Sequence, residues 1–291
     1  MLNIEKPLTI LVRRRAALGD TIMSTGIVRE LKKKYNCEID VATEFLEVYN
    51  NNPHIKNLYH ASAMPDPSAY DLYINLDDAY EYNPINNYLD SYFYRAFGTP
   101  DVDNKSVELF PNKFDMDIVN SFCQDNELDK YIVIHIRQWY WELKNMSWDT
   151  WYSVFSGLFE ERVDFKIVCV GSITDGTVDH PLFVDAREKL NVQQQKLLMD
   201  NASCFVGIDS GPYHIAAAST TPIVSLHTHL LPERIVPTWK KVTPILSNVD
   251  CTGCNDKQQR PVREVICKYG DFRCSNNFDA NEIVNAILEN L

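Results

Sequence analysis

Residues 204–227 read CFVGIDSGPYHIAAASTTPIVSLH, and this stretch decides the fold. The apolar run at 204–208 is typical of a short buried strand. In the turn DSGP at 209–212, the first two residues offer oxygens that cap a helix, the glycine allows close backbone approach, and the proline suits a first helical turn. The alanines at 216–218 let that helix lie close to a sheet, and 222–227 reads as a second strand. This order of elements predicts a parallel α/β sheet.

The DSGP turn has two interpretations. A helix N-terminus presents unpaired N–H groups and the positive end of its dipole, so it can hold an anion such as phosphate. The turn would then lie at the carboxyl edge of a strand, where open α/β sheets bind ligands. The same residues can equally do no more than cap the helix. The stretch taken alone leaves both interpretations open.

The composition is that of an ordinary globular chain. Its 291 residues are 45% hydrophobic and 23% charged, which is enough for about two domains with cores of their own. Its 28 basic and 40 acidic residues give a net charge of −12, which argues against sequence-independent binding of nucleic acid. The basic run at 32–34 reads as a solvated helix face, whereas the run at 13–15 ends a strand just before a Gly-Asp turn.

No segment of the sequence predicts a membrane-spanning helix or a secretory signal. The apolar run at 8–12 is too short for either, and it follows Glu5, Lys6 and Pro7. No other window approaches the ~18 uninterrupted apolar residues of a span. We therefore expect a cytoplasmic protein that touches the inner face of the membrane only peripherally, where its substrate requires it.

The eight cysteines fall into two groups. Four scattered ones read as buried, inert thiols: Cys37, Cys123, Cys169 and Cys204. The other four form C-x2-C-x12-C-x6-C, a spacing compatible with a structural zinc or iron held by four thiolates: Cys251, Cys254, Cys267 and Cys274. Because the last gap is wider than in zinc knuckles and ribbons, four free thiols remain the alternative.

Strand-like and helix-like segments alternate along the whole chain, which predicts two α/β domains with parallel sheets. A polar segment at 124–130 precedes the strong strand signal at 131–136, so we place the boundary there and expect domains at 1–127 and 128–291. The last segment, 279–291, has apolar residues at helical spacing and is predicted to be a helix that packs on either domain.

With these elements in place, two separated motifs resemble glycosyltransferase family 9, the ADP-heptose:lipopolysaccharide heptosyltransferases and their relatives. RRRAALGDTIMSTGIVRELKKKY at 13–35 is similar to the family's opening strand, Gly-Asp turn and first helix, and VGIDSGPYHIAAASTTPIVSL at 206–226 is similar to its donor-phosphate motif. KNMSWDTW at 144–151 resembles the stretch in which a lysine precedes the first helix of the donor domain. The resemblance implies a GT-B fold, in which an acceptor-binding and a nucleotide-sugar-binding Rossmann-like domain face each other across a cleft.

In the first motif, the resemblance implies that Asp20 is the general base that takes the proton of the acceptor hydroxyl. A carboxylate suits this role because a sugar hydroxyl is a poor nucleophile until its proton is removed. From the residues alone, Asp20 can equally cap the helix predicted from Thr21. Arg14 and Gly19 are carried over as acceptor-binding positions, with a structural surface role as the alternative for Arg14.

The resemblance assigns five residues of the second motif to the donor. Asp209 is expected to hold hydroxyls of the donor sugar. Ser210 and Gly211 are expected to donate hydrogen bonds to the diphosphate, and Pro212 and His214 to complete the turn. As an alternative, His214 is a buried histidine that supports the turn. Lys144 matches the lysine that faces the donor phosphates, where its charge stabilises the departing diphosphate without a divalent metal. Asp175 is carried over as a ribose contact.

The chain departs from the family pattern after two strands. Arg137 and Gln138 stand where the family has small or hydroxylated residues near the phosphates, and a bulky WYWEL stretch follows them. His227 and Thr228 stand where the family tends to have a Phe-Gly turn. These departures put the donor geometry and the nucleotide in question.

The expected function is an inverting, metal-independent glycosyltransferase. It would move heptose or a related sugar from a nucleotide sugar, ADP-heptose by the resemblance, to a hydroxyl of a bacterial glycolipid or glycan. One alternative is a non-catalytic protein of the same fold that binds nucleotide sugars or glycans. Another is a GT-B-type nucleotide-sugar epimerase, which needs no acceptor.

Overall fold

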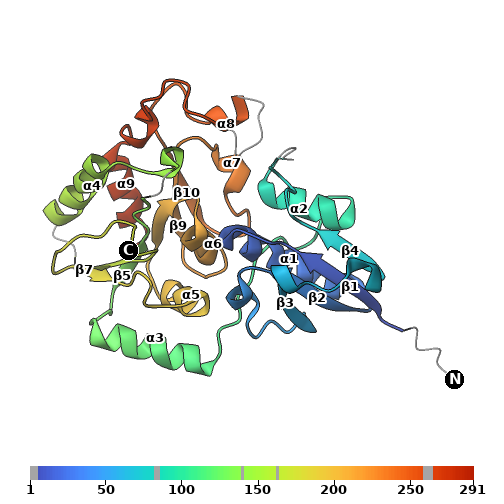
Figure 1. The fold of residues 1–291 in the computed structure, drawn as a ribbon. Helices are drawn as coiled ribbons and strands as arrows, with labels where there is room; N and C mark the ends of the chain where they lie inside the picture. The colour runs from blue at the N-terminus through green and yellow to red at the C-terminus, as the bar shows by residue number, and fades with distance from the viewer. Residues whose placement is uncertain (1–5, 82–85, 139–140, 162–163, 258–264) are drawn as a thin grey trace. The chain divides into compact units, whose positions relative to one another are not determined.

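The computed structural model describes residues 6–81, 86–138, 141–161, 164–257 and 265–291. The chain forms two compact units, Met1–Phe110 and Pro111–Leu291. Each unit is built on one parallel sheet with helices packed on it (Figure 1), which confirms the predicted α/β class.

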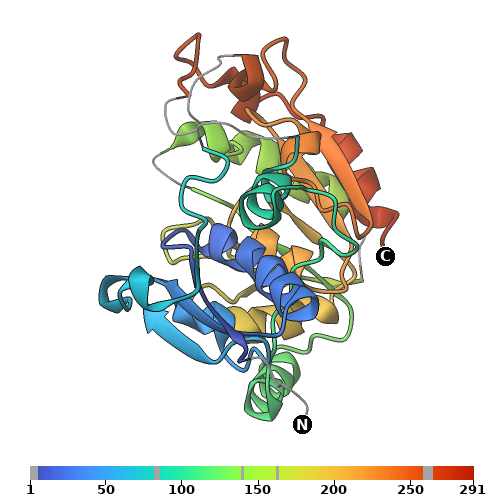
Figure 2. The ribbon, with the colours of Figure 1, turned by 90° about the vertical axis from the view of Figure 1, so that its right-hand side faces the viewer.

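The first unit holds a four-stranded sheet in the order β3-β2-β1-β4, and every pairing in it is parallel. Its strands are β1 (Leu8–Arg13), β2 (Cys37–Thr43), β3 (Asn57–His60) and β4 (Leu72–Asn75). Around it lie α1 (Leu18–Lys34), α2 (Tyr88–Phe97) and the 3-10 turns η1 (Leu46–Tyr49), η2 (Ala61–Ala63) and η3 (Pro67–Ala69). The long blue helix that faces the viewer in Figure 2 is α1, which packs against β2 and α2.

Helix α1 begins at Leu18, earlier than the predicted start at Thr21. Gly19 and Asp20 therefore lie within its first turn, whereas we predicted them in a turn before it. The carboxylate of Asp20 accepts a hydrogen bond from the backbone N–H of Ala17 at 3.3 Å, so it satisfies one of the free donors at the start of the helix. The capping role weighed for Asp20 is thus present, at a position inside the helix.

The second unit holds a six-stranded parallel sheet in the order β10-β9-β8-β5-β6-β7. Its strands are β5 (Tyr131–Ile134), β6 (Lys166–Cys169), β7 (Phe183–Asp185), β8 (Phe205–Ile208), β9 (Ile223–His227) and β10 (Val242–Leu246). Its helices and turns are α3 (Lys113–Asp125), η4 (Glu142–Lys144), α4 (Trp148–Glu160), α5 (Val192–Asp200), α6 (Gly211–Ala217), α7 (Pro232–Ile235), α8 (Cys254–Lys257), η6 (Arg273–Ser275) and α9 (Ala280–Leu288).

The division between the units lies before α3, whereas the predicted boundary at 127/128 lies after it. Helix α3 packs against α5 of the second unit, where the Gln194 Nε2 donates a hydrogen bond to the Asp115 Oδ1 at 3.2 Å. The apolar periodicity of α3 identifies it as a helix, but it does not say which sheet the helix covers.

The core of the second unit lies between its sheet and the pair α4 and α9. Trp151 and Phe155 of α4 are buried in one cluster with Ile283 and Ile287 of α9. The two helices lie side by side, α4 in green and α9 in red (Figure 1). The final helix, for which either domain was predicted as the partner, thus packs within the second unit. No helix in the described part of the chain is long and apolar enough to cross a membrane.

Candidate active site

The order of the strands in the second sheet places a ligand site at one position. Successive strands are added on one side of β5 as far as β7, and then the chain returns to β8 on the other side of β5. In open parallel sheets, ligands bind outside the carboxyl ends of the strands at this point of reversal. His135 follows β5, and Asp209 follows β8. The predicted donor-binding motif therefore lies where the topology expects a ligand.

Lys144 and Asp209, two predicted site residues, form an ion pair at this edge. The Nζ of Lys144 contacts the Oδ2 of Asp209, and the Nε2 of His214 lies 3.2 Å from the Oδ1 of the same carboxylate. Burial alone would raise the pKa of Asp209, but Lys144 and His214 together outweigh burial and hold that pKa well below its usual range. A single carboxylate thus ties the lysine to the helix that follows β8.

Ser210, the first capping residue of α6, belongs to a second hydrogen-bonded chain. Its Oγ lies 2.9 Å from the Nδ1 of His135, and the Nε2 of His135 lies 3.1 Å from the Oδ2 of Asp175. Burial lowers the pKa of His135 against the opposing effect of the Asp175 carboxylate, so the ring is neutral. Its one N–H then points at Asp175, and its other nitrogen accepts the hydroxyl proton of Ser210.

Asp175 is more enclosed than a ribose contact requires. Besides His135, its carboxylate accepts hydrogen bonds from the backbone N–H groups of Ser172 at 2.8 Å and Gln138 at 3.0 Å. Burial raises its pKa, but the hydrogen bond to His135 and those from the backbone outweigh this and place the pKa far below its usual value. Asp175 therefore holds together the turns that follow β5 and β6, and its contact with a ribose stays a prediction.

The glycine of this turn makes the arrangement possible. Gly171 has a φ of +129°, a conformation that other residues rarely adopt. A Cβ atom at this position would lie 2.6 Å from the Asp175 Oδ2 and 2.8 Å from the ring of His135. Only glycine leaves room for the histidine–carboxylate hydrogen bond.

The residues after β9 hold the turn that carries Lys144. The hydroxyl of Thr228 donates a hydrogen bond to the backbone carbonyl of Leu143, and the Nδ1 of His229 lies 3.0 Å from the same oxygen. Burial, and then the charge of Lys144, lower the pKa of His229 to about 3, so its ring is a neutral N–H donor. The departure from the family pattern at Thr228 thus has a local structural role.

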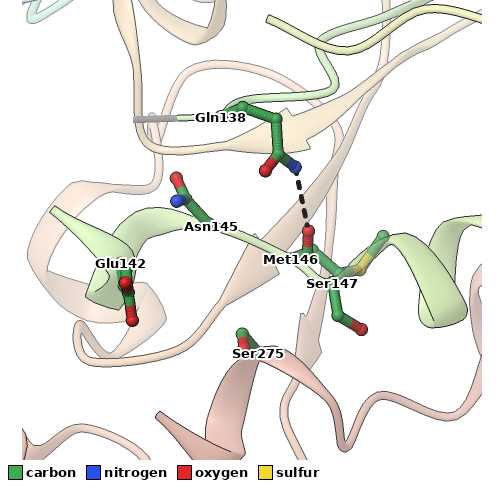
Figure 3. Close-up of a pocket in the computed structure, with 6 residues that line it drawn as sticks. All are labelled: Gln138, Glu142, Asn145, Met146, Ser147 and Ser275. Atoms are coloured by element: carbon green, nitrogen blue, oxygen red, sulfur yellow. Dashed lines mark hydrogen bonds between the residues drawn. The ribbon is translucent and has the colours of Figure 1, made fainter. Parts of the chain in front are cut away.

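A pocket of about 380 Å³ opens beside this turn. Polar side chains dominate its lining, which Figure 3 shows: Gln138, Glu142, Asn145, Met146, Ser147 and Ser275. The Nε2 of Gln138 donates to the backbone oxygen of Met146 at 3.4 Å, across the upper part of the pocket in Figure 3. Gln138, which is also one of the departures from the family pattern, therefore lines this pocket. Trp139 and Tyr140 of the WYWEL stretch lie outside the described residues.

In the first unit, Arg14 and Asp20 form a buried ion pair, with the Nη2 of Arg14 3.0 Å from the Oδ1 of Asp20. Arg14 is only 2% exposed, so the surface role weighed for it is wrong. Gly19 is also buried, in the first turn of α1. The reversal of strand order between β1 and β4 places these residues at the carboxyl edge of the first sheet.

One of the four spaced cysteines, Cys274, lies close enough to the other three for them to affect its pKa. Burial, and then the charges of Cys251, Cys254 and Cys267, raise the pKa of Cys274 to about 12. Among the residues that the structure describes, no three or more His, Cys, Asp or Glu side chains are arranged to hold a metal ion. The cysteine segment is joined to the loop after β9, since the N–H of Gly253 donates to the carbonyl of Thr228 at 3.0 Å.

The sequence did not single out His135. A histidine after an apolar run at 131–134 has the pattern of a core residue, and its partners lie 40 and 75 residues away along the chain. Its place at the carboxyl end of the strand before the reversal was the one available signal, and that signal requires the strand order.

Comparison of the sequence with known proteins matches part of the second unit to one family. The family described as glycosyltransferase family 9 (heptosyltransferase) matches residues 161–263. Lipopolysaccharide heptosyltransferase 3 of Escherichia coli is 40% identical over 60 residues, which are 21% of this chain and 17% of that protein. The chain thus matches less than a fifth of the length of this curated relative.

Solved structures resemble the chain over nearly its whole length. A family 9 glycosyl transferase from Veillonella parvula has a TM-score of 0.74 at 17% identity, with 97% of each chain covered. The iron-containing dodecameric glycosyltransferase TibC of enterotoxigenic E. coli has a TM-score of 0.73 at 15% identity, over 99% of this chain and 79% of that one. The E. coli ADP-heptose lipopolysaccharide heptosyltransferase II has a TM-score of 0.66 at 15% identity, over 97% and 99%.

At these identities the structural matches show the fold. The family match is independent of them, since it rests on the sequence of residues 161–263 in the second unit. The resemblance of this chain to glycosyltransferase family 9 is thereby confirmed.

Proposed function

We propose that the protein is a glycosyltransferase that moves heptose or a related sugar from a nucleotide sugar to a hydroxyl of a bacterial glycolipid or glycan. ADP-heptose is the donor that we propose, because one solved relative, TibC, is described in complex with ADP-D-β-D-heptose. The observation that carries the proposal is the pairing of Lys144 with Asp209 at the point where the strand order reverses.

On the donor side, the bond between the anomeric carbon and the diphosphate breaks, and the diphosphate gains negative charge. A cation beside the diphosphate stabilises that charge more in the departing group than in the bound donor, which lowers the barrier. We assign this role to Lys144, whose ammonium would turn from Asp209 towards the diphosphate. Asp209 then has an oxygen free to accept a hydrogen bond from a sugar hydroxyl. Ser210, Gly211, Pro212 and His214 would position the diphosphate.

On the acceptor side, Asp20 would take the proton of the attacking hydroxyl as the new bond to the anomeric carbon forms. Attack on the face opposite the leaving diphosphate inverts the configuration at that carbon. Charge stabilisation by Lys144 fits a reaction that uses no divalent metal. Arg14, buried beside Asp20, would act on the acceptor through that carboxylate.

Transfer of heptose from ADP-heptose tests this function. Asp20→Asn should lower turnover by about 100-fold or more, since general-base catalysis typically contributes that much. Lys144→Ala should lower turnover and also weaken binding of ADP. Asp149→Asn, an exposed carboxylate on α4, serves as the control and should keep both. Unchanged turnover in Asp20→Asn would refute the assigned base.

One observation favours a non-catalytic alternative: Asp209 already neutralises Lys144. A protein that only binds the nucleotide sugar would bind ADP-heptose and give no transfer to any glycolipid or glycan and no release of ADP. An epimerase would convert free ADP-heptose without an acceptor. Product analysis of ADP-heptose incubated with the protein alone and with acceptors separates the three.

We also propose that the four spaced cysteines hold one structural iron or zinc ion. Support comes from their spacing, from the nearness of Cys274 to the other three thiols and from the description of TibC as iron-containing. Thiolates suit either metal, and binding would fix the segment that is joined to Thr228. Elemental analysis of purified protein should find about one ion per chain, and protein with all four cysteines replaced by serine should contain none. A cytoplasmic location with peripheral membrane contact completes the proposal.

A further inference from the structure

Asp20, the base of the proposed reaction, lies in a cluster of buried polar groups, and three members of that cluster, Tyr80, Glu81 and Tyr92, have no part in that proposal. Arg14 reaches Asp20 from the end of β1, Tyr80 from the segment after β4, and Tyr92 from α2. Glu81, next to Tyr80, contacts Arg14. All belong to the first unit. The side chains of Arg14, Glu81 and Tyr92 are almost wholly buried, and Asp20 keeps 14% of its side chain exposed.

The two carboxylate oxygens of Asp20 have different surroundings. Oδ1 accepts hydrogen bonds from the hydroxyls of Tyr80 and Tyr92, each at 2.9 Å, and also contacts Arg14 at 3.0 Å. Within the described part of the chain, Oδ2 accepts one weak hydrogen bond, from the N–H of Ala17 at 3.3 Å. Oδ1 is therefore saturated, and Oδ2 keeps a lone pair that can take a proton.

The tyrosines act as fixed donors. Burial raises the pKa of Tyr80 and of Tyr92 well above the usual range, so both hydroxyls keep their protons. Hydrogen bonds to the charged form of a carboxylate favour that form. The two tyrosines thus hold Oδ1 of Asp20 and prevent rotation of the carboxylate about the Cβ–Cγ bond.

Arg14 would weaken the base if it served Asp20 alone. The same nitrogen, Nη2, lies 3.0 Å from the Oδ1 of Asp20 and 2.9 Å from the Oε1 of Glu81. One guanidinium is therefore shared by two carboxylates, and the cluster carries a net negative charge. Glu81 therefore competes with Asp20 for the same nitrogen of Arg14.

We infer that Tyr80, Tyr92 and Glu81 are positioning residues that set the direction and the strength of Asp20 as a base. Bound at Oδ1, Asp20 takes the proton at Oδ2. The acceptor oxygen bonds to the anomeric carbon, the bond to the diphosphate oxygen breaks with its electron pair, and the hydroxyl proton passes to Oδ2. This inference rests on the proposed role of Asp20.

The pH dependence of ADP release from ADP-heptose, with water or a glycan as the acceptor, tests it. Glu81→Gln leaves Arg14 to Asp20 alone, so the acid-side midpoint of kcat/KM should move down by about one pH unit, and the plateau should fall several-fold because the base is weaker. Tyr80→Phe and Tyr92→Phe each remove a donor to the carboxylate, so the midpoint should move up by about half a unit or more. A merely structural role does not produce opposite shifts.

Two variants serve as controls. Tyr94 lies on α2, as Tyr92 does, but its side chain is 52% exposed, so Tyr94→Phe should keep the wild-type pH profile of kcat/KM. Glu81→Asp keeps the charge and should restore the midpoint that Glu81→Gln moves. Circular dichroism and urea denaturation of each whole-chain variant, compared with the wild type, report that its first unit is folded. Midpoints that stay in place, or that all move the same way, while Asp20→Asn is inactive would overturn the inference and leave the base assigned. Full activity in Asp20→Asn would instead overturn the proposed function.

Discussion

The ionised side chains that lie deepest in the two candidate sites occur as hydrogen-bonded pairs and not as single charges. Lys144 is paired with Asp209, and Arg14 is paired with both Asp20 and Glu81. Removal of one partner from such a pair leaves a charge in a site of low polarity, which costs more stability than the pair contributes. Substitution of any of these residues should therefore lower the stability of the fold, apart from its effect on any chemistry that the residue performs.

Asp209→Asn should separate the two effects at the donor site. Loss of the carboxylate leaves Lys144 unpaired, and because both side chains are slightly exposed we expect a loss of about 1–3 kcal/mol in the free energy of unfolding. The released ammonium should bind ADP at least as tightly as before, whereas ADP-heptose should lose affinity with its sugar contact. Urea denaturation and calorimetric titration with both ligands measure this, with Asp149→Asn as the control. If Asp209→Asn lowered the affinity for ADP more than the affinity for ADP-heptose, the assigned contacts would be contradicted.

Gly171→Ala should be costly for two separable reasons. The added Cβ has to adopt a φ of +129° and meets the Asp175–His135 hydrogen bond, so we expect a loss of about 2 kcal/mol or more. Gly270→Ala is the matched control, because Gly270 has a φ of +70° but nothing within 4 Å of the added atom. Urea denaturation of both variants isolates the steric part. Equal losses would show that the hydrogen-bonded chain does not depend on this glycine.

At the scale of elements, the loops after the parallel strands carry the site, and the strands mainly position them. The loop after β9 illustrates this, since Thr228 and His229 both contact the carbonyl of Leu143 in the turn that ends at Lys144. Burial lowers the pKa of His227 to about 4 and that of His229 to about 3. Both rings are thus neutral in the folded protein at any pH at which it would act.

These two histidines predict how stability depends on pH. In the unfolded chain a histidine titrates near pH 6.5, so below that pH the unfolded state binds protons that the folded state does not. The free energy of unfolding should therefore fall as the pH drops from about 6.5 to 4.5, by up to about 1.4 kcal/mol per pH unit for each histidine. His229→Asn should reduce this slope by up to about 1.4 kcal/mol per pH unit, which corresponds to one proton. His60→Asn, at an exposed position, should leave the slope unchanged. Urea denaturation across this range measures the slope, and equal slopes in both variants would contradict the assignment.

At the scale of the molecule, the predicted donor residues all belong to one unit. Lys144, Asp175 and the 209–214 turn lie in Pro111–Leu291, which has its own sheet and its own core. A unit of this size with a continuous apolar core can fold by itself. Arg14 and Asp20 belong to the other unit.

A fragment that comprises residues 111–291 should therefore fold cooperatively and bind ADP. We expect an ADP affinity within about tenfold of that of the whole chain, because the phosphate-contacting residues are all present. Circular dichroism on heating and calorimetric titration test this, and the fragment that starts at residue 128, which lacks α3, is the comparison. Equal behaviour of the two fragments would show that α3 contributes nothing to the second unit.

The sequence predicted the fold well and the contacts of the site less well, for physical reasons. The strands at 131–134, 205–208 and 223–227 follow from apolar runs, since a buried parallel strand needs one on both faces. The motif around Asp209 could be placed at a strand end for the same reason. The ion pair with Lys144 could not be predicted, because its partners are 65 residues apart and meet only through the strand order. His135 escaped notice because its neighbours in sequence are those of a core residue.

The position of α9 has a consequence for shortened forms of the gene product. Ile283 and Ile287 lie in the same apolar cluster as Trp151, on the helix that directly follows the Lys144 turn. A premature stop codon shortly before residue 280 would thus remove α9 from the hydrophobic core and expose the aromatic side chains of α4 to water. Its product should accumulate as insoluble or degraded polypeptide, not as a slightly smaller enzyme.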